Sequence, residues 1–291
     1  MSHSEDIEDH DLGLSHDLPR IMARRGLLGL LGGVGAAAAL TACGSDGSTP
    51  DSASSTTSAT TNGGPGGAPP AGGGGDTGVT VADGEIPEET AGPYPGDGSN
   101  GPNVLTESGV VRSDITTSFG SASGVAAGVP TTVNLKVYDL NGDSITALAG
   151  AAVYLWHCDR DGRYSLYDDE VSGENYLRGV QEADADGNLT FTTIFPACYQ
   201  GRWPHMHFEV YESLAAATSA TNKLRTSQLA LPEDVCNDVY ANADGYDSSQ
   251  STFAGVSLDS DNVFSDGHSL QLATVTGSID DGYTVTLNVP V

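Results

Sequence analysis

Positively charged side chains are scarce in this sequence. Lys and Arg together number 11 against 39 Asp and Glu, which gives a formal net charge of −28 at pH 7. A surface of that sign repels the phosphates of nucleic acids and the headgroups of anionic lipids. We therefore expect no nucleic-acid partner and a solvated acidic surface that keeps the protein in solution.

Charged residues of both signs are few as well. They make up 17% of the chain, Lys is rare, and Gly occurs 38 times. This composition is unlike that of a helical protein.

Cysteine is almost absent. Cys43 belongs to an N-terminal segment with its own explanation, so the folded domain keeps Cys158, Cys198 and Cys236. An odd number allows at most one internal disulfide and leaves a free thiol, and an exported location would permit that bridge. We favour pairing of Cys198 with Cys236, because Cys158 lies in an apolar strand pattern where a buried thiol is ordinary.

A long hydrophobic run suited to a membrane span is missing too. The apolar stretch at residues 26–42 is short and rich in Gly, which is typical of a signal sequence. The pair Arg24-Arg25 precedes it and resembles a twin-arginine export signal. The residues directly before Cys43 resemble a bacterial lipobox, in which a peptidase cuts before the cysteine and the thiol carries diacylglycerol.

These signals predict that residues 1–42 are a twin-arginine-type lipoprotein signal. We expect the protein to be exported and held on the outer face of the cytoplasmic membrane by a lipid on Cys43, its only link to the membrane. A secreted form without lipid and a retained helix are the alternatives.

Residues 43–81 are nearly all Gly, Ser, Thr, Ala, Pro and Asp. Such a segment cannot bury enough apolar surface to offset its chain entropy, so we expect a disordered, flexible tether. The remaining residues, 82–291, suit one large all-β domain.

Short β-patterned runs separated by turn signals fill this domain. Many short strands at this spacing predict an all-β fold, an antiparallel β-sandwich with long loops and little helix. A helical turn or two is expected at 232–239, where Pro and acidic residues suit a helix start. The expected strands are 131–138, 151–156, 188–194, 205–211, 271–275 and 283–289.

One strand carries the pair His205 and His207. Residues i and i+2 of a strand point to the same face, about 6–7 Å apart, so the two imidazoles suit one metal ion. Alone, the pair could equally be a chance pair or part of a zinc or copper site. Tyr199 and Arg202 lie a few residues upstream, and Tyr164 follows a Gly turn further upstream.

At these residues the sequence resembles the intradiol ring-cleavage dioxygenases, the family of the protocatechuate and catechol dioxygenases. The resemblance covers roughly residues 85–291 and is greatest to a short, exported, single-domain branch. The matching pieces are W-x-x-D-x-x-G-x-Y from Trp156 to Tyr164, Leu177-Arg178-Gly179, Phe191 to Ile194, Tyr199 with Gly-Arg-x-x-His-x-His, and E-T-x-G-P-Y from Glu89 to Tyr94.

The resemblance implies a non-haem Fe(III) held by Tyr164, Tyr199, His205 and His207, with hydroxide in a fifth position. Phenolate oxygen is hard and anionic and favours the ferric state, and neutral imidazole completes the set. Because a free tyrosine has a pKa near 10, the metal must hold both phenols deprotonated.

It also implies separate catalytic roles. Tyr164 stays on the metal, whereas Tyr199 is displaced when catechol chelates and then helps to accept substrate protons. Arg202 matches an arginine that stabilises negative charge on the ring. Gln228 matches a glutamine beside the reacting centre.

We therefore expect an intradiol dioxygenase, an oxidoreductase that inserts both atoms of O2 into a catechol-type diol to give a cis,cis-muconate-type diacid. The alternative is a non-catalytic, tethered β-sandwich that serves as a binding module. A protocatechuate-type substrate would need a partner for its carboxylate, for which Arg163 and Arg178 are candidates. Asp259, Asp261 and Asp266 fit Asp-rich turns, with a calcium site as the alternative.

The lipid anchor makes a direct prediction. Cys43→Ala removes the thiol that would carry the lipid, so the protein should move from the membrane fraction to the soluble fraction, as measured by fractionation and immunoblotting. Cys158→Ala is the matched control and should leave the distribution unchanged. A mature N-terminus well before residue 43, or unchanged fractionation of Cys43→Ala, would contradict the anchor.

Overall fold

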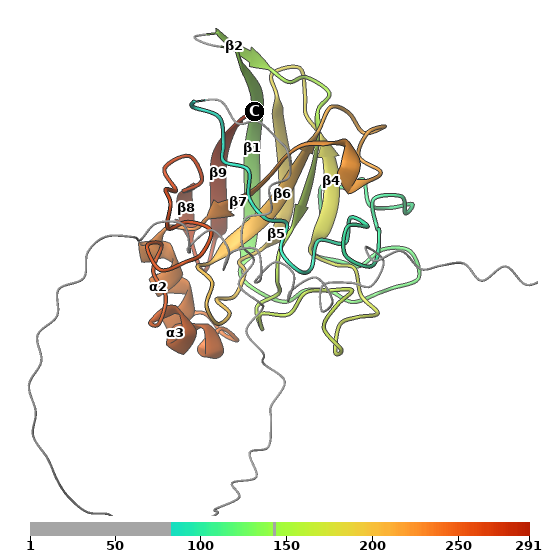
Figure 1. Cartoon of the computed structure of the whole chain (residues 1–291). Coiled ribbons are helices and arrows are strands. Elements are labelled where there is room, and N and C mark those ends of the chain that lie inside the picture. The colour runs from blue at the N-terminus through green and yellow to red at the C-terminus, as the bar shows by residue number, and fades with distance from the viewer. Residues whose placement is uncertain (1–82, 142–143) are drawn as a thin grey trace, which may run out of the picture. The chain divides into compact units, whose positions relative to one another are not determined.

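The computed structural model describes residues 83–141 and 144–291, so the predicted signal (1–42) and tether (43–81) lie outside the described residues. Two β-sheets packed face to face make up the body of the domain, as Figure 1 shows. No helix in the described part of the chain is long and apolar enough to cross a membrane.

The first sheet has five strands and is built around the long strand β1 (Pro130–Asn141). On one side, β5 (Asn188–Ile194) pairs with its first part and β2 (Ser144–Ala147) with its last part. On the other side lies β9 (Gly282–Pro290), followed by the edge strand β8 (Thr274–Ser278).

The second sheet has four strands in the order β4-β3-β6-β7, and every pair in it is antiparallel. Its strands are β4 (Arg178–Glu182), β3 (Ala152–Trp156), β6 (His205–Tyr211) and β7 (Lys223–Ala230). All residues of β3 and β6 are buried, because the loops of the domain cover the face of this sheet that points away from the first sheet.

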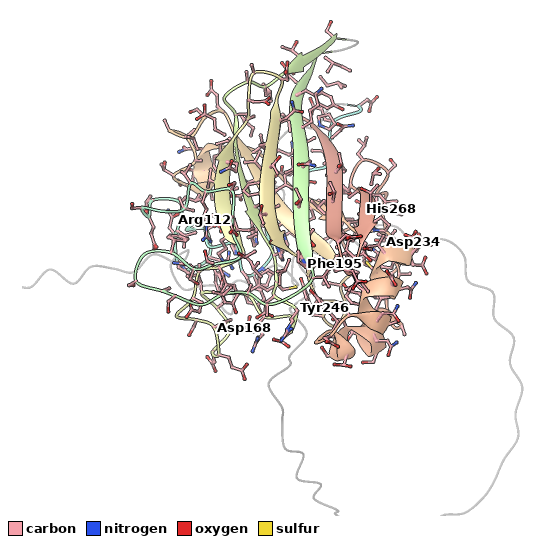
Figure 2. The ribbon with its side chains drawn as sticks, turned by 180° about the vertical axis from the view of Figure 1, so that it is seen from behind. Arg112, Asp168, Phe195, Asp234, Tyr246 and His268 are labelled. Atoms are coloured by element: carbon pink, nitrogen blue, oxygen red, sulfur yellow. The ribbon has the colours of Figure 1, made fainter. Side chains whose placement is uncertain are left out.

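Within residues 83–141 and 144–291, helix is confined to short pieces before and after β7. They are the 3-10 helix η2 (Ala220–Asn222) and the α-helices α2 (Glu233–Asn242) and α3 (Asp247–Phe253). The hydroxyl of Tyr246, next to α3, donates to the carbonyl of Phe195 at 2.7 Å, and Figure 2 shows these two residues close together at the end of the sheets. This contact ties the helical segment to the sandwich.

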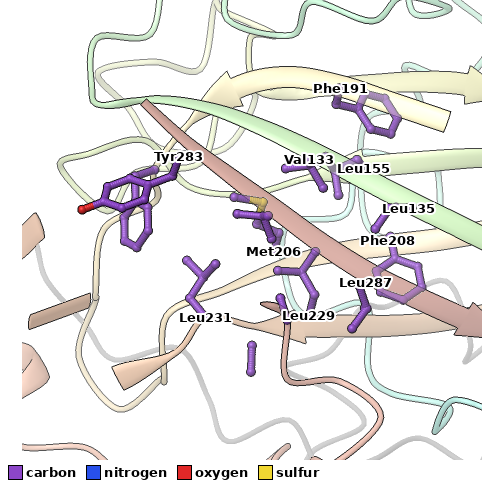
Figure 3. Packing of buried hydrophobic residues seen from close by; sticks show 14 of the residues in the cluster. Val133, Leu135, Leu155, Phe191, Met206, Phe208, Leu229, Leu231, Tyr283 and Leu287 are labelled. Atoms are coloured by element: carbon purple, nitrogen blue, oxygen red, sulfur yellow. The ribbon is translucent and has the colours of Figure 1, made fainter. Parts of the chain in front are cut away.

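The main hydrophobic core lies between the two sheets. Alternate residues of each strand point into it, as the two-residue period of a strand requires. Figure 3 shows Met206 and Phe208 of β6 in this core with Val133 and Leu135 of β1 and Leu287 of β9.

The all-β sandwich and the scarcity of helix are confirmed, and the expected strands 188–194 and 205–211 have the bounds of β5 and β6. The sandwich is not antiparallel throughout, because β1 and β9 pair in parallel. The helix α3 was not expected from the sequence.

The preferred disulfide is wrong for this structure, in which Cys158, Cys198 and Cys236 are buried free thiols. The Cys198 thiol instead contacts the carbonyl oxygen of Arg202 at 3.5 Å. Burial raises the pKa of the Cys158 and Cys236 thiols well above the ordinary value, so both stay protonated.

The core makes a stability prediction. Phe208 is fully buried between the sheets, so Phe208→Ala should lower the free energy of unfolding by about 3–5 kcal/mol. The control is Ile145→Ala on β2, whose side chain is 68% exposed and whose loss should change stability by less than about 0.5 kcal/mol. Urea unfolding followed by tryptophan fluorescence measures both, and similar losses would contradict the core assignment.

Candidate metal centre

His205 and His207 lie on β6 and point away from the core between the sheets. Their neighbours Met206 and Phe208 occupy that core, and the alternation of the strand turns both imidazoles to the opposite face. The two side chains are nonetheless only 2% and 3% exposed, so any ion they bind is screened from bulk water.

The antiparallel register sets the neighbours of His207. Trp156 of β3 and Gln228 of β7 lie directly opposite it on either side. The Trp156 ring stacks on the imidazole, with centroids 5.0 Å apart and planes at 9°, and Tyr154 stacks on Trp156 in turn. Neither His207 Nδ1 nor Trp156 Nε1 has a hydrogen-bond partner in the described part of the chain. Stacking therefore orients His207, where a hydrogen bond to the second ring nitrogen usually orients a metal-binding histidine.

His205, in contrast, is oriented by a hydrogen bond to its second ring nitrogen. Its Nδ1–H donates to the carbonyl oxygen of Trp203 at 2.5 Å, which fixes the tautomer and turns Nε2 toward the centre.

Tyr164 comes from the loop after β3, and the spacing of its motif has a local cause. One carboxylate oxygen of Asp159 accepts the backbone N–H groups of Asp161 and Arg163, at 2.9 and 3.0 Å. Gly162 follows with φ of 84°, a left-handed conformation that glycine adopts without strain. This turn delivers the Tyr164 ring to the face of the sheet on which the histidines lie.

Tyr199 comes from the loop after β5 and meets the first loop closely. A Cβ atom on Gly162 would lie 3.4 Å from the Cβ of Tyr199, so the two loops pack with little space between them. The rings of Tyr164 and Tyr199 meet edge to face at 5.9 Å. Tyr199 is partly exposed, whereas Tyr164 is only 2% exposed.

The donor atoms of these four residues converge. The Tyr164 and Tyr199 hydroxyls are 3.3 Å apart, Tyr199 lies 3.1 Å from His205 Nε2, and the two Nε2 atoms are 3.1 Å apart. A metal with bonds of about 2.0–2.1 Å would separate neighbouring donors by roughly 2.8–3.4 Å, so the cluster fits one ion. No group of three or more His, Cys, Asp and Glu gathers anywhere in residues 83–141 and 144–291, so a metal here depends on the phenols.

The electrostatics of the cluster suit a highly charged cation. Burial, and then Arg202, lowers the pKa of His205, and burial lowers the pKa of His207, so both imidazoles are in the neutral form that binds metals. Burial raises the pKa of Tyr164 and of Tyr199. Only a nearby cation of high charge would ionise both phenols, which favours a trivalent metal and makes its binding release protons.

Arg202 lies beside the cluster in a fixed orientation. Its Nε donates to Asp261 at 2.9 Å, one Nη donates to the Gln228 amide oxygen at 2.6 Å, and the other lies 3.4 Å from His205 Nε2. Asp261 is fully buried, and its other oxygen accepts two backbone N–H groups, so this ion pair is held rigidly. A positive charge thus faces the donors from one side.

The segment Glu89–Tyr94 covers the remaining side. The amide nitrogen of Gln228 donates to the Thr90 carbonyl at 2.8 Å, which ties the segment to β7. Gly92 has φ of 73°, and a Cβ there would lie 3.3 Å from Cε1 of His207. The Tyr94 ring packs 5.0 Å from that of Tyr164. The glycine of the E-T-x-G-P-Y motif is therefore needed for its backbone shape and for its closeness to His207.

The six residues predicted as metal ligands and catalytic groups thus lie together, and their roles stay predictions; Cys43, the predicted lipidation site, lies outside the described residues. Sequence reasoning missed Asp261, which looked like a turn residue and is 59 positions from its partner Arg202. It also missed the stacking role of Trp156, for which strand register was the only available signal. Thr90 acts through its carbonyl oxygen and leaves no side-chain signature.

Known proteins that are similar to this chain are dioxygenases. Residues 100–230 match the family model for a dioxygenase domain. A segment of 52 residues is 42% identical to a chlorocatechol 1,2-dioxygenase of Pseudomonas sp. (strain P51), and it covers 18% of this chain and 20% of that protein. The chain thus spans only about a fifth of that curated relative's length.

The fold is also that of solved dioxygenases. An intradiol ring-cleavage dioxygenase from Tetranychus urticae superposes with a TM-score of 0.54 at 23% identity, over 71% of this chain and 93% of that one. A second solved dioxygenase gives 0.55 at 22% identity with the same coverage. Residues 100–230 thus match the dioxygenase family model, and the domain has the fold of solved intradiol ring-cleavage dioxygenases.

The Trp156 stack makes a prediction about metal affinity. Trp156→Leu removes the ring that orients His207 and should weaken iron binding by about 10–100-fold. Trp156→Phe keeps an aromatic face at the same position and should lose much less metal affinity. Competition with a chelator measures the affinities, and thermal unfolding without iron checks that both variants fold. Equal losses in the two variants would show that stacking does not orient the ligand.

Proposed function

We propose that this protein is a non-haem Fe(III) intradiol dioxygenase that cleaves a catechol-type diol with O2 to give a cis,cis-muconate-type diacid. The observation that carries the proposal is the convergence of two phenols and two imidazoles beside the Arg202–Gln228 pair. When bound, a ferric ion would supply the charge that holds catechol as a dianion and makes its ring electron-rich enough to react with O2.

The side chains divide the remaining tasks by their environment. Tyr164 is nearly inaccessible and would hold the metal as the lasting phenolate, whereas the partly exposed Tyr199 would be the ligand that can give way to catechol. Because burial raises the pKa of Tyr199, a free Tyr199 phenolate is a strong base and takes up a catechol proton.

Arg202 and Gln228 act on the bound ring. The guanidinium is aimed by Asp261 and Gln228, so its charge is in place before negative charge develops on the ring, and no reorganisation is needed at the moment of reaction. Burial of the site strengthens this interaction, because water screens it weakly there.

We propose the same location as the sequence indicates. The enzyme would be exported and tethered by lipid on Cys43 to the outer face of the cytoplasmic membrane, or secreted. It would then act on catechols outside the cytoplasm.

Iron-loaded protein should be burgundy, with a broad visible band from tyrosinate-to-iron charge transfer, and should consume O2 with catechol. Tyr164→Phe should weaken or shift that band and lower turnover by at least about a hundredfold, because a buried phenolate ligand is lost. Tyr167→Phe removes a nearby hydroxyl outside the cluster and is the matched control. A colourless protein that takes up no iron after aerobic reconstitution would overturn the proposal and favour the non-catalytic binding module.

A further inference from the structure

The charged side chains around the proposed site are either acidic or already paired with an acid. Among the Lys and Arg side chains that the structure describes, Arg202 is the one that contacts the four-residue cluster. Arg202 itself is neutralised by the buried carboxylate of Asp261, at 2.9 Å. The positive charge that contacts the cluster is therefore already paired with a carboxylate.

Arg178 was a candidate for binding a substrate carboxylate, but its donors are used inside the protein. It is 1% exposed and donates to the carbonyl oxygens of Tyr94, Pro95 and Ser165 and to the Ser165 hydroxyl. It holds the Glu89–Tyr94 segment against the loop of Tyr164. Arg178 is thus a structural clamp with no free face for a ligand.

Arg163, the other candidate, is satisfied by acids. It forms ion pairs with Asp159, Asp161 and Glu170, at 3.1, 2.5 and 2.6 Å. An incoming carboxylate would compete with three existing partners for this one guanidinium.

The remaining basic residues are committed to other parts of the molecule. Arg225 pairs with Glu85, and Lys223 lies 3.6 Å from Glu209. Arg112 donates to backbone carbonyls, among them that of Arg178. Arg160 packs close to Gly245, and Lys136 of β1 lies near Asp184 in the turn before β5.

Two acidic side chains, in contrast, lie next to residues of the site. Asp168 accepts the backbone N–H of Tyr164 at 2.6 Å, and this carboxylate, after burial, raises the pKa of the adjacent Tyr94. Glu89 begins the segment that covers His207, is only partly exposed, and accepts from Gln271 at 3.3 Å. Its carboxyl group is close enough to interact electrostatically with Arg202.

We infer that this site takes catechols whose ring substituents are uncharged or cationic and rejects catechols that carry a carboxylate, with Glu89 as the specificity-determining acid on the Arg202 side. The inference rests on the proposed function, because it concerns the ring that the proposed metal would hold. A ring carboxylate would gain no ion pair and would face a like charge in a poorly hydrated site, which lowers affinity on the order of tenfold or more.

The selectivity should also depend on pH. Burial, and then the charge of Asp266, raises the pKa of Glu89 to about 7; Asp261 raises it as well, and Gln271 and Arg202 lower it. Glu89 is therefore largely charged at pH 8.5 and largely neutral at pH 5.5. A benzoate stays ionised at both pH values. Its affinity relative to that of an uncharged phenol should therefore rise as the pH falls through about 7 and Glu89 loses its charge.

Three phenols with the same ring and different charges test this directly. We expect 4-methylphenol and tyramine to bind the iron-loaded protein at least about tenfold more tightly than 4-hydroxybenzoate at pH 8.5, as measured by isothermal titration calorimetry. Equal or tighter binding of 4-hydroxybenzoate would overturn the inference. Binding of none of the three would overturn the assignment of the site to phenol-type rings.

A matched pair of variants then tests the role of Glu89. Glu89→Gln keeps the acceptor for Gln271 and removes the charge. The ratio of the affinities for 4-methylphenol and 4-hydroxybenzoate should therefore fall by at least about threefold, and this affinity gap should no longer depend on pH. Glu182→Gln removes an equal charge at an exposed position of β4 and should change neither. An unchanged gap in a folded Glu89→Gln protein would overturn the role of Glu89.

Oxygen uptake with catechol, run in parallel, separates this inference from the proposed function. Protein that consumes oxygen with catechol but binds all three phenols equally overturns only the substrate class. Protein that discriminates among the phenols but consumes no oxygen overturns only the dioxygenase proposal.

Discussion

The site depends on the register in which β6 lies between β3 and β7. That register places Trp156, His207 and Gln228 side by side on one face, while the intervening Met206 and Phe208 fill the core on the other. A slip of one residue would turn the apolar side chains outward and the imidazoles into the core. The hydrophobic packing between the sheets therefore also holds the two histidines in position.

The two tyrosines need a different kind of support, because they come from loops. The Asp159 turn and the left-handed Gly162 bring Tyr164 and Tyr199 within contact of each other, and both loops pack on the rigid sheet. Arg178 adds a further restraint by tying the first loop to the segment that covers the site. These contacts restrain the two loops, which by themselves hold side chains less precisely than strands do.

Free positive charge is scarce both in the composition of the chain and at the site. The chain has 11 basic and 39 acidic residues, and the basic residue that contacts the cluster, Arg202, is paired with an acid, as are Arg163 and Arg225. Arg202 can therefore stabilise charge that develops on a bound ring without offering an open site for a substrate carboxylate. Net charge governs which partners approach, and the local pairs govern what the site accepts.

Much of the fold and the site followed from local patterns in the sequence. Alternation of apolar and polar residues predicted β5 and β6 to the residue, because each strand side chain records which face it occupies. The resemblance of short motifs to those of the intradiol dioxygenases identified the four converging side chains, and such motifs are recognisable since a turn such as that at Gly162 needs particular residues at particular positions.

Tertiary structure alone decided the contacts between distant segments. The parallel pairing of β1 with β9, the partnership of Arg202 with Asp261 and the free state of Cys198 and Cys236 left no local pattern. The sequence by itself determined which residues face the site and what chemistry they bring. Which of them touch, and how their charges cancel, depended on packing, because such pairs lie far apart along the chain and meet only when the sheets close on each other.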